Sequence, residues 1–249
     1  MLADLLRPNP QARITELTVG DGEHRVVVVD DFYAEPERLV ELAGDLYYVH
    51  GKVNGNFPGG RAVVSIDTRP LFGVMSQLWG APLMPYGNEY QPLMLSTILH
   101  GQVELNIAQR SPHIDPGVSA MVYLNAEADC AGGTGLYRHA LTGLERVPVQ
   151  PTAPLLEFAA EFGYGPRWFQ SPEDYTRWQD AMVFNPLFAA DEGYINDGND
   201  YWELMHLLEM KFNRLVIFDG RIPHSQYIKD GQFEETLRLN QIAYAQGQD

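Results

Sequence analysis

Short strand-like segments, separated by turns rich in glycine, proline and asparagine, recur along the second half of this sequence. Strands are predicted over residues 93–99, 103–108, 119–125, 214–218, 224–228 and 236–244, and residues 132–137 form a turn that enters a further strand. Strands this short and numerous usually enclose a core by packing as two antiparallel sheets. We therefore predict a mainly β protein, a two-sheet barrel or jelly roll, with helices packed at its N-terminal side.

The N-terminal part of the chain mixes strands and helices. The pattern predicts strands over residues 14–19 and 25–29 around a Gly20-Asp21-Gly22 turn, a helix after Pro36, an exposed loop over 50–60, a strand over 62–66 and a helix over 70–79. These are the helices expected to pack against the β-sheets.

Residues 150–210 differ from the rest in composition. They hold eleven acids, two bases and 12 of the 28 aromatic residues, and Ser171 followed by Pro172 is typical of a helix start. We therefore expect one domain over residues 1–249, with residues 150–210 as a helical insert or lid inside it. Its aromatic residues either bind a ligand or form the core of a small helical subdomain.

Composition excludes several classes of protein and partner. The chain has 249 residues, 45% of them hydrophobic and 20% charged, and no apolar run approaches the roughly 20 residues of a membrane span. A net charge of −16 would repel nucleic acid and anionic membranes. A single cysteine, Cys130, and an acid in the first residues argue against disulfides, a cysteine-based zinc site and export. We expect a cytoplasmic protein that acts on a small-molecule or peptide substrate; the oligomeric state stays open.

The segment Ser111–Gly117 carries the strongest chemical signal. In an extended chain residues i and i+2 point to the same side, so His113 and Asp115 can converge on one point. A neutral nitrogen and an anionic oxygen supply two thirds of a 2-His-1-carboxylate metal site. We predict that His224, at the start of a later strand, supplies the third ligand.

The order of these motifs resembles that of the Fe(II)/2-oxoglutarate-dependent oxygenase superfamily, in its prolyl-hydroxylase-like branch. The residues that carry the resemblance are His113-Ile114-Asp115, Tyr123-Leu124-Asn125 running on to Gly132-Gly133-Thr134, Leu215-Val216-Ile217-Phe218 with His224, and Arg238. It covers residues 91–244 and leaves the insert unmatched. It implies a double-stranded β-helix that binds Fe(II), 2-oxoglutarate as cosubstrate, and dioxygen.

The resemblance also assigns roles to single residues. His113, Asp115 and His224 would be the catalytic iron ligands. Arg238 would bind the distal carboxylate of 2-oxoglutarate bidentately, with Arg221 and Arg214 as alternatives. Tyr123, Asn106 and Ser225 are candidates for hydrogen bonds to the cosubstrate, whereas His24, His50, His100, His139 and His206 are expected to be packing or surface residues.

The implied activity is hydroxylation of an amino acid, a peptide or another small molecule, coupled to decarboxylation of 2-oxoglutarate to succinate. Related halogenases have a small residue where this chain has Asp115, so the carboxylate favours hydroxylation or desaturation. The acidic, aromatic-rich insert is compatible with a cationic or aromatic substrate group. The alternatives are a catalytically silent jelly-roll binding protein and a cupin-like protein or hydrolase that uses another metal.

Overall fold

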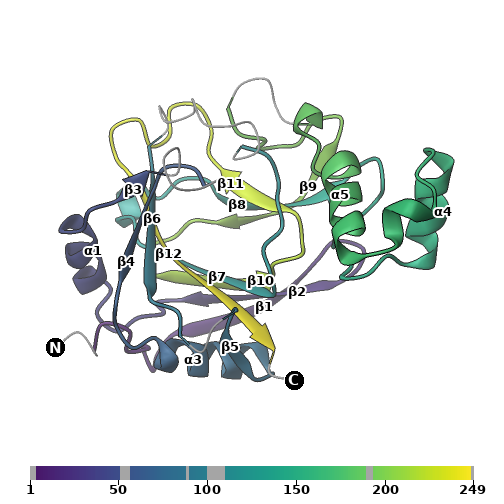
Figure 1. Ribbon diagram of the computed structural model, residues 1–249. Helices are drawn as coiled ribbons and strands as arrows, with labels where there is room; N and C mark the ends of the chain where they lie inside the picture. Colours follow the sequence, from purple (N-terminus) through teal and green to yellow (C-terminus); the bar gives the residue numbers. More distant parts are fainter. Residues whose placement is uncertain (1–3, 51–56, 88–89, 100–109, 189–192, 248–249) are drawn as a thin grey trace.

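Two antiparallel β-sheets lie one above the other in the computed structural model, with helices on the outer side of the larger sheet and a separate helical lobe beside them (Figure 1). The structure describes residues 4–50, 57–87, 90–99, 110–188 and 193–247. The α-helices are α1 (Glu37–Gly44), α3 (Arg69–Trp79), α4 (Ala153–Glu161) and α5 (Pro172–Met182). Within the described ranges, no helix has both the length and the apolar character needed to cross a membrane.

The larger sheet contains strands from both ends of the chain. Its spatial order is β1 (Arg13–Val19), β2 (His24–Asp30), β10 (Arg214–Asp219), β7 (Val118–Tyr123), β12 (Arg238–Gly247), β6 (Leu93–Ile98), β4 (Gly60–Val64) and β3 (Val49–His50), and β5 (Leu83–Pro85) pairs with the end of β12. All of these pairs are antiparallel.

The smaller sheet has the order β11 (His224–Tyr227), β8 (Gly133–His139) and β9 (Trp202–Glu209). After β7 the chain passes to the smaller sheet for β8 and β9 and returns to the larger sheet for β10. It then crosses to the smaller sheet for β11 and ends in the larger sheet with β12. These crossings bring the starts of β11 and β12 into a common cavity between the sheets.

The central strands of the larger sheet are buried on both faces. In β2, Val27 and Val29 pack with α1 and α3, while Val26 and Val28 pack with the cluster between the two sheets. Successive residues of a strand point to opposite faces, and both faces of β2 are apolar because both are covered. Each fully buried valine of this kind stabilises the fold by about 1.5 to 3 kcal/mol. The described residues thus form a mainly antiparallel β protein with packed helices, as the sequence predicts.

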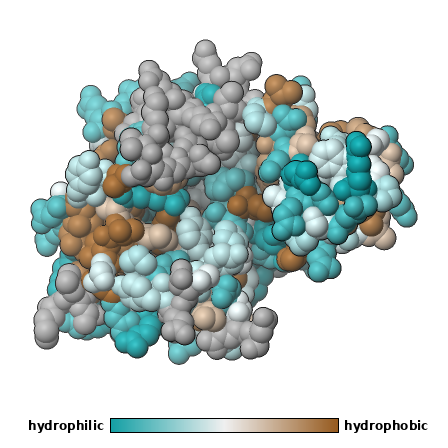
Figure 2. Space-filling model, viewed as in Figure 1, coloured by the Kyte–Doolittle hydropathy of each residue, from teal (hydrophilic) through white to brown (hydrophobic). Residues whose placement is uncertain are grey.

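The helical lobe has an aromatic core. Tyr175 and Trp178 of α5 pack with Trp202 of β9 and with Leu155 of α4, and all four side chains are buried. The outward face of this lobe is largely hydrophilic (Figure 2). These aromatic side chains therefore pack as the core of a small helical subdomain.

The start of α5 follows the predicted capping pattern. The Asp174 backbone N–H donates to Ser171 Oγ at 3.1 Å, and Pro172 occupies the first turn. The capped helix places Trp178 on the buried side of α5.

The prediction that residues 150–210 are helical is wrong for its last part. Residues 202–209 form β9, which pairs with β8 along its length. Their leucine, methionine and glutamate residues favour a helix, but antiparallel pairing with β8 and burial of Trp202 outweigh that local preference.

The other predicted elements lie close to their expected positions. Predicted strands over 14–19, 25–29 and 62–66 are observed as β1, β2 and β4, and the predicted helix over 70–79 is α3. The predicted loop over 50–60 is bounded by β3 and β4, which pair with each other. The predicted strand over 103–108 lies outside the described residues.

Candidate metal centre and its cavity

Backbone pairing places two histidines side by side. The His113 N–H donates to the His224 carbonyl oxygen at 2.9 Å, and the His224 N–H donates to the His113 carbonyl oxygen at the same distance. Residues that exchange hydrogen bonds in this way face each other across an antiparallel pair, with side chains on the same side. The two imidazole centroids accordingly lie 4.6 Å apart.

Asp115 is held against this pair by the loop that follows β10. Its N–H donates to the Gly220 carbonyl oxygen at 2.7 Å, and Ser119 Oγ donates to its Oδ2 at 3.2 Å. The same Oδ2 lies 3.1 Å from His224 Nε2. One ligand atom from each of His113, Asp115 and His224 therefore lies within 4.8 Å of the other two.

The hydrogen bonds of His224 favour a cation at this point. Its Nδ1 lies 2.8 Å from the Ile222 carbonyl oxygen, and donation to that oxygen leaves the lone pair of Nε2 pointing at the Asp115 carboxylate. His224 Nε2 and Asp115 Oδ2 are then two acceptors that face each other, and a metal ion between them could accept electron pairs from both. Bonds of about 2.1 Å at right angles separate neighbouring ligand atoms by about 3 Å, close to the observed spacing.

The protonation states of the cluster suit metal binding. Burial, and then the charge of His224, lower the pKa of His113 to about 4, so its imidazole is neutral at pH 7. Burial would raise the pKa of Asp115, but its close contact with His224 and the nearby His113 lower it to about 2. Neutral imidazole and ionised carboxylate are the forms that ligate a metal.

Arg238 is a buried cation in the same cavity. Only 1% of it is exposed, its Nη2 donates to the Gly133 carbonyl oxygen at 3.0 Å, and its Nε has no hydrogen-bond partner. Burial lowers the pKa of the guanidinium. It forms no ion pair with any residue that the structure describes. Since an unpaired buried charge is costly, the cavity favours an anionic ligand beside Arg238.

One cavity contains both the His113, Asp115 and His224 group and Arg238. It is lined by Phe57, Pro58, Arg61, Ser96, Ile98, His113, Asp115, Met121, Thr134, His224, Ser225, Gln226, Arg238, Asn240, Ile242 and Tyr244. Four of these side chains carry a buried polar atom that lacks a hydrogen-bond partner in the described chain: Arg61, Ser225, Gln226 and Arg238. Buried polar atoms are normally paired, so this concentration makes the cavity the candidate ligand site.

In this conformation the cavity is small, about 50 Å³. A five-carbon dicarboxylate needs more room than this. The side chain of Met121 reaches into the cavity, with Sδ 3.9 Å from Arg238 Nη2. Methionine is flexible and its sulfur is a weak acceptor, so a carboxylate can displace it.

The remaining predicted cosubstrate residues differ in their availability. Ser225 lines the cavity with an Oγ that has no hydrogen-bond partner in the described chain. The hydroxyl of Tyr123 is already shared with Thr134 Oγ1 at 2.8 Å and the Leu208 carbonyl oxygen at 3.1 Å, although its ring lies beneath the Arg238 guanidinium. Asn106 lies outside the described residues.

The two alternative arginines are engaged elsewhere. Arg214 Nε donates to Asp30 at 2.6 Å, and Arg221 Nη2 donates to the Pro148 carbonyl oxygen at 2.7 Å. Neither lines the cavity. Of these three arginines, Arg238 is the one that lines the cavity beside His113, Asp115 and His224.

The histidines that were expected to be packing or surface residues are not part of the His113, Asp115 and His224 group, as far as the described residues show. His139 is fully buried between Phe188 and Trp202, and burial lowers its pKa to about 4. His24 lies 3.3 Å from Glu145. These contacts are consistent with packing and surface roles.

Sequence reasoning missed Arg61, Thr134 and Gln226 as cavity residues. No motif surrounds Arg61, which enters the cavity through the pairing of β4 with β6. On β12, by contrast, the alternation of a strand does identify the cavity face, since Arg238, Asn240, Ile242 and Tyr244 all line the cavity.

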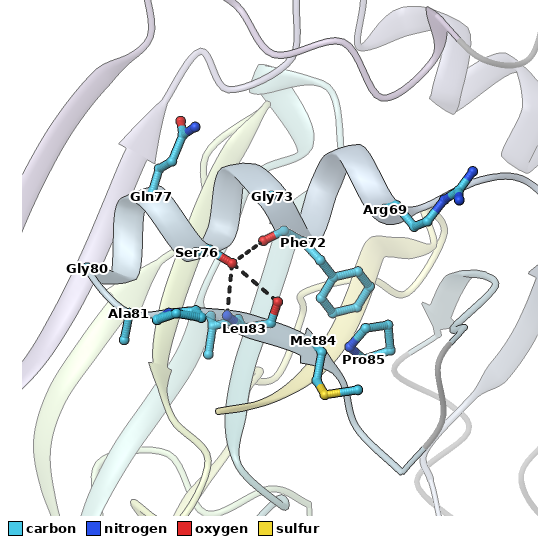
Figure 3. Close-up of a pocket in the computed structure, with 11 residues that line it drawn as sticks. Arg69, Phe72, Gly73, Ser76, Gln77, Gly80, Ala81, Leu83, Met84 and Pro85 are labelled. Carbon is cyan, nitrogen blue, oxygen red and sulfur yellow. Dashed lines mark hydrogen bonds between the residues drawn. The ribbon is translucent and has the colours of Figure 1, made fainter. Parts of the chain in front are cut away.

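A larger hollow of about 740 Å³ lies elsewhere, between α3 and β5. Figure 3 shows Ser76 at its centre, where Oγ donates to the Phe72 carbonyl oxygen at 2.7 Å and accepts from the Leu83 N–H at 2.9 Å. Its one charged lining residue, Arg69, pairs with Asp67. This hollow lies where α3 packs beside β5, and its described lining residues include no cluster of reactive groups.

Comparison with known proteins places the chain in a family. The profile of a family of unknown function, DUF6445, matches residues 10–166 and 169–236, and the chain belongs to that family. The matched spans include His113, Asp115 and His224, and Arg238 lies just beyond the second span. A search of curated proteins found no match.

Proposed function

We propose that this protein is an Fe(II)/2-oxoglutarate-dependent dioxygenase that hydroxylates a small molecule, amino acid or peptide. The observation that carries the proposal is the pairing of a His-Asp-His cluster with a buried arginine that lacks a counter-ion among the described residues, across one cavity. A dianion that chelates the metal at one end and meets Arg238 at the other satisfies both features.

The arrangement of strands supports a jelly roll, or double-stranded β-helix, as the underlying fold. The chain alternates between two facing antiparallel sheets, and the segment containing His113 pairs with β11 at the edge of the smaller sheet. Jelly rolls consist of two such sheets with connections that cross between them. In this fold the metal ligands lie between the sheets, where His113, Asp115 and His224 are found.

In the proposed reaction, 2-oxoglutarate, dioxygen and a substrate C–H group give succinate, carbon dioxide and the C–OH product. Bound Fe(II) would supply the activation of dioxygen, with His113, Asp115 and His224 as its protein ligands. Arg238 would fix the distal carboxylate of 2-oxoglutarate, and Ser225 offers a hydroxyl to the same ligand. The apolar Ile98 and Ile242 would limit water in the cavity.

The alternatives explain less of the cavity. A hydrolase using another metal gives Arg238 no task, and a silent binding protein gives no reason for three convergent ligand groups. Both remain outcomes of the test below.

Calorimetric titration tests the role of Arg238. Anaerobic, Fe(II)-loaded protein is titrated with 2-oxoglutarate and, in parallel, with glutarate, which lacks the chelating keto group. Because a charge-assisted hydrogen bond contributes about 1.5 to 3 kcal/mol, Arg238→Gln should weaken 2-oxoglutarate binding about 10-fold to 150-fold. Wild type should bind glutarate much more weakly than 2-oxoglutarate.

Arg167→Gln, at an exposed arginine of the helical lobe, is the matched control and should bind 2-oxoglutarate like wild type. Equal affinity for glutarate and 2-oxoglutarate, or no effect of Arg238→Gln, would argue against the proposal. Metal binding without any 2-oxoglutarate binding would favour a protein that uses another metal.

A further inference from the structure

We propose that Arg61 binds a carboxylate of the primary substrate, so that the substrate is a free amino acid or a similarly small carboxylic acid. The inference rests on the proposed function, because it assigns the second cation of the same cavity. It names a residue and a substrate class that the motifs do not.

Arg61 is poised in the cavity without a counter-ion among the described residues. Its guanidinium lies over the ring of Phe57, 4.2 Å from the ring centre, and its Nη2 donates to the Tyr244 hydroxyl at 3.5 Å. Its Nε is buried without a hydrogen-bond partner, and no ion pair links Arg61 to any part of the chain that the structure describes. The contact with Phe57 holds the guanidinium in place while leaving donors free.

Tyr244 adds a second donor beside this guanidinium. Burial, and then the charge of Asp115, raise the pKa of Tyr244 to about 12, so the phenol stays protonated. Its oxygen accepts from Arg61, which leaves its hydrogen available to an acceptor in the cavity. Arg61 and Tyr244 together match the two oxygens of a carboxylate.

Arg61 and Arg238 lie on strands that are not neighbours in the larger sheet. In the pairing registers, Ser96 of β6 lies opposite Arg61 of β4 on one side and opposite Asn240 of β12 on the other. The backbones of β4 and β12 are therefore two strand spacings apart, about 10 Å. The two arginines thus enter the cavity from different strands, and the proposal assigns Arg238 to the cosubstrate and Arg61 to the substrate.

Arg61 lines the same cavity as His113, Asp115 and His224. Tyr244, which accepts a hydrogen bond from Arg61, lines that cavity as well. A small carboxylic acid anchored at Arg61 would thus present its neighbouring carbon atoms to the metal cluster. Proximity of this kind is what a positioned oxidation requires.

Charge balance calls for one more anion. A divalent metal and the two guanidinium groups, less Asp115, carry three positive charges, of which dianionic 2-oxoglutarate neutralises two. The remaining charge is that of Arg61, in a chain whose net charge is −16. This cavity therefore selects a negative substrate group, in contrast to the cationic group suggested by the acidic insert.

The test compares acids with their amides. Wild-type protein loaded anaerobically with Fe(II) and 2-oxoglutarate is titrated calorimetrically with the twenty protein amino acids and with their α-carboxamides. The proposal predicts at least one amino acid that binds tenfold or more tightly than its amide. In Arg61→Gln that preference should disappear, in Arg61→Lys it should persist in part, and 2-oxoglutarate affinity should stay within twofold of wild type.

Arg69→Gln, at an exposed arginine of α3, is the control and should keep the preference. Circular dichroism and thermal unfolding check that Arg61→Gln is folded. The inference is overturned if no acid binds better than its amide, if the preference survives in Arg61→Gln, or if Arg61→Gln weakens 2-oxoglutarate as Arg238→Gln does. Failure of wild type to bind 2-oxoglutarate would instead contradict the proposed function, and the acid and amide comparison on Fe(II)-loaded protein would still decide the role of Arg61.

Discussion

Gly133 links the cavity to the backbone of the smaller sheet. Its φ of +151° is in a region that side chains rarely adopt, and a Cβ built there would lie 2.1 Å from the Leu208 carbonyl oxygen. Its own carbonyl oxygen accepts the hydrogen bond from Arg238. Because Gly133 has no side chain, β8 can approach β9 closely at this point. The carbonyl oxygen of Gly133 holds the Arg238 guanidinium in place.

We expect Gly133→Ala to lower the free energy of unfolding by about 2 to 4 kcal/mol, because it combines backbone strain with a backbone clash. Urea unfolding measures the loss. Gly165→Ala is the control, since its φ is negative and a Cβ added there would meet no atom within 4 Å. A Gly133→Ala protein as stable as Gly165→Ala would mean that the close approach to β9 is not maintained in solution.

Single cavity residues could be predicted from the sequence only where a short motif contains them. His113 and Asp115 lie two residues apart, and the spacing alone suggests that they converge. Arg61 has no such signal, because it reaches the cavity only through the pairing of β4 with β6, a contact between segments distant in sequence. The sequence likewise cannot predict that Arg238 Nε lacks a hydrogen-bond partner among the described residues, because this depends on its burial in the folded chain.

Among the elements, the turn between β1 and β2 is tied to the segment after β8 by one carboxylate. Glu145 accepts from the Asp21 N–H at 3.0 Å and from the Gly22 N–H at 2.8 Å, and Arg138 Nε donates to it at 2.9 Å. Burial alone would raise the pKa of Glu145, but these donors lower it below its ordinary value of 4.5. Glu145 therefore stabilises the fold above about pH 4.5, and this contribution is lost as the pH falls through its lowered pKa.

Glu145→Gln should reduce the free energy of unfolding at pH 7 by about 1.5 to 3 kcal/mol, the value of hydrogen bonds to a charged group. The difference from wild type should shrink as the pH falls below about 4.5 and the carboxylate becomes protonated. Urea unfolding at pH 7 and at a pH below that value measures both, with Glu41→Gln on the exposed face of α1 as control. A difference that does not change with pH would contradict the role of the ionised carboxylate.

Element prediction succeeded where the hydrophobic pattern was unambiguous. In β2 both faces are covered, and a continuous valine run marks the strand. In β9 the residues favour a helix, and the strand exists because β8 pairs with it. Partners distant in sequence decide such segments, so local patterns cannot assign them.

In the molecule as a whole, a strongly acidic chain encloses a cavity with two arginines and a candidate metal cluster. The two-sheet architecture follows from the number and length of the predicted strands, whereas the strand order and the cavity depend on crossings that no local pattern specifies. The larger sheet packs against α1 and α3 on one face and forms a wall of the cavity on the other. Function is proposed from that cavity, where the chain concentrates buried polar groups without partners among the described residues.

The most direct measurement is an anaerobic absorption titration of metal-free protein with Fe(II) and then 2-oxoglutarate. Chelation of the iron by the keto acid should produce a visible charge-transfer band that requires both components. The band should be absent in His113→Ala and retained in His206→Ala, a histidine of β9 outside the cavity. A folded wild-type protein that gives no band, or a His113→Ala protein that gives the same band as wild type, would contradict the account.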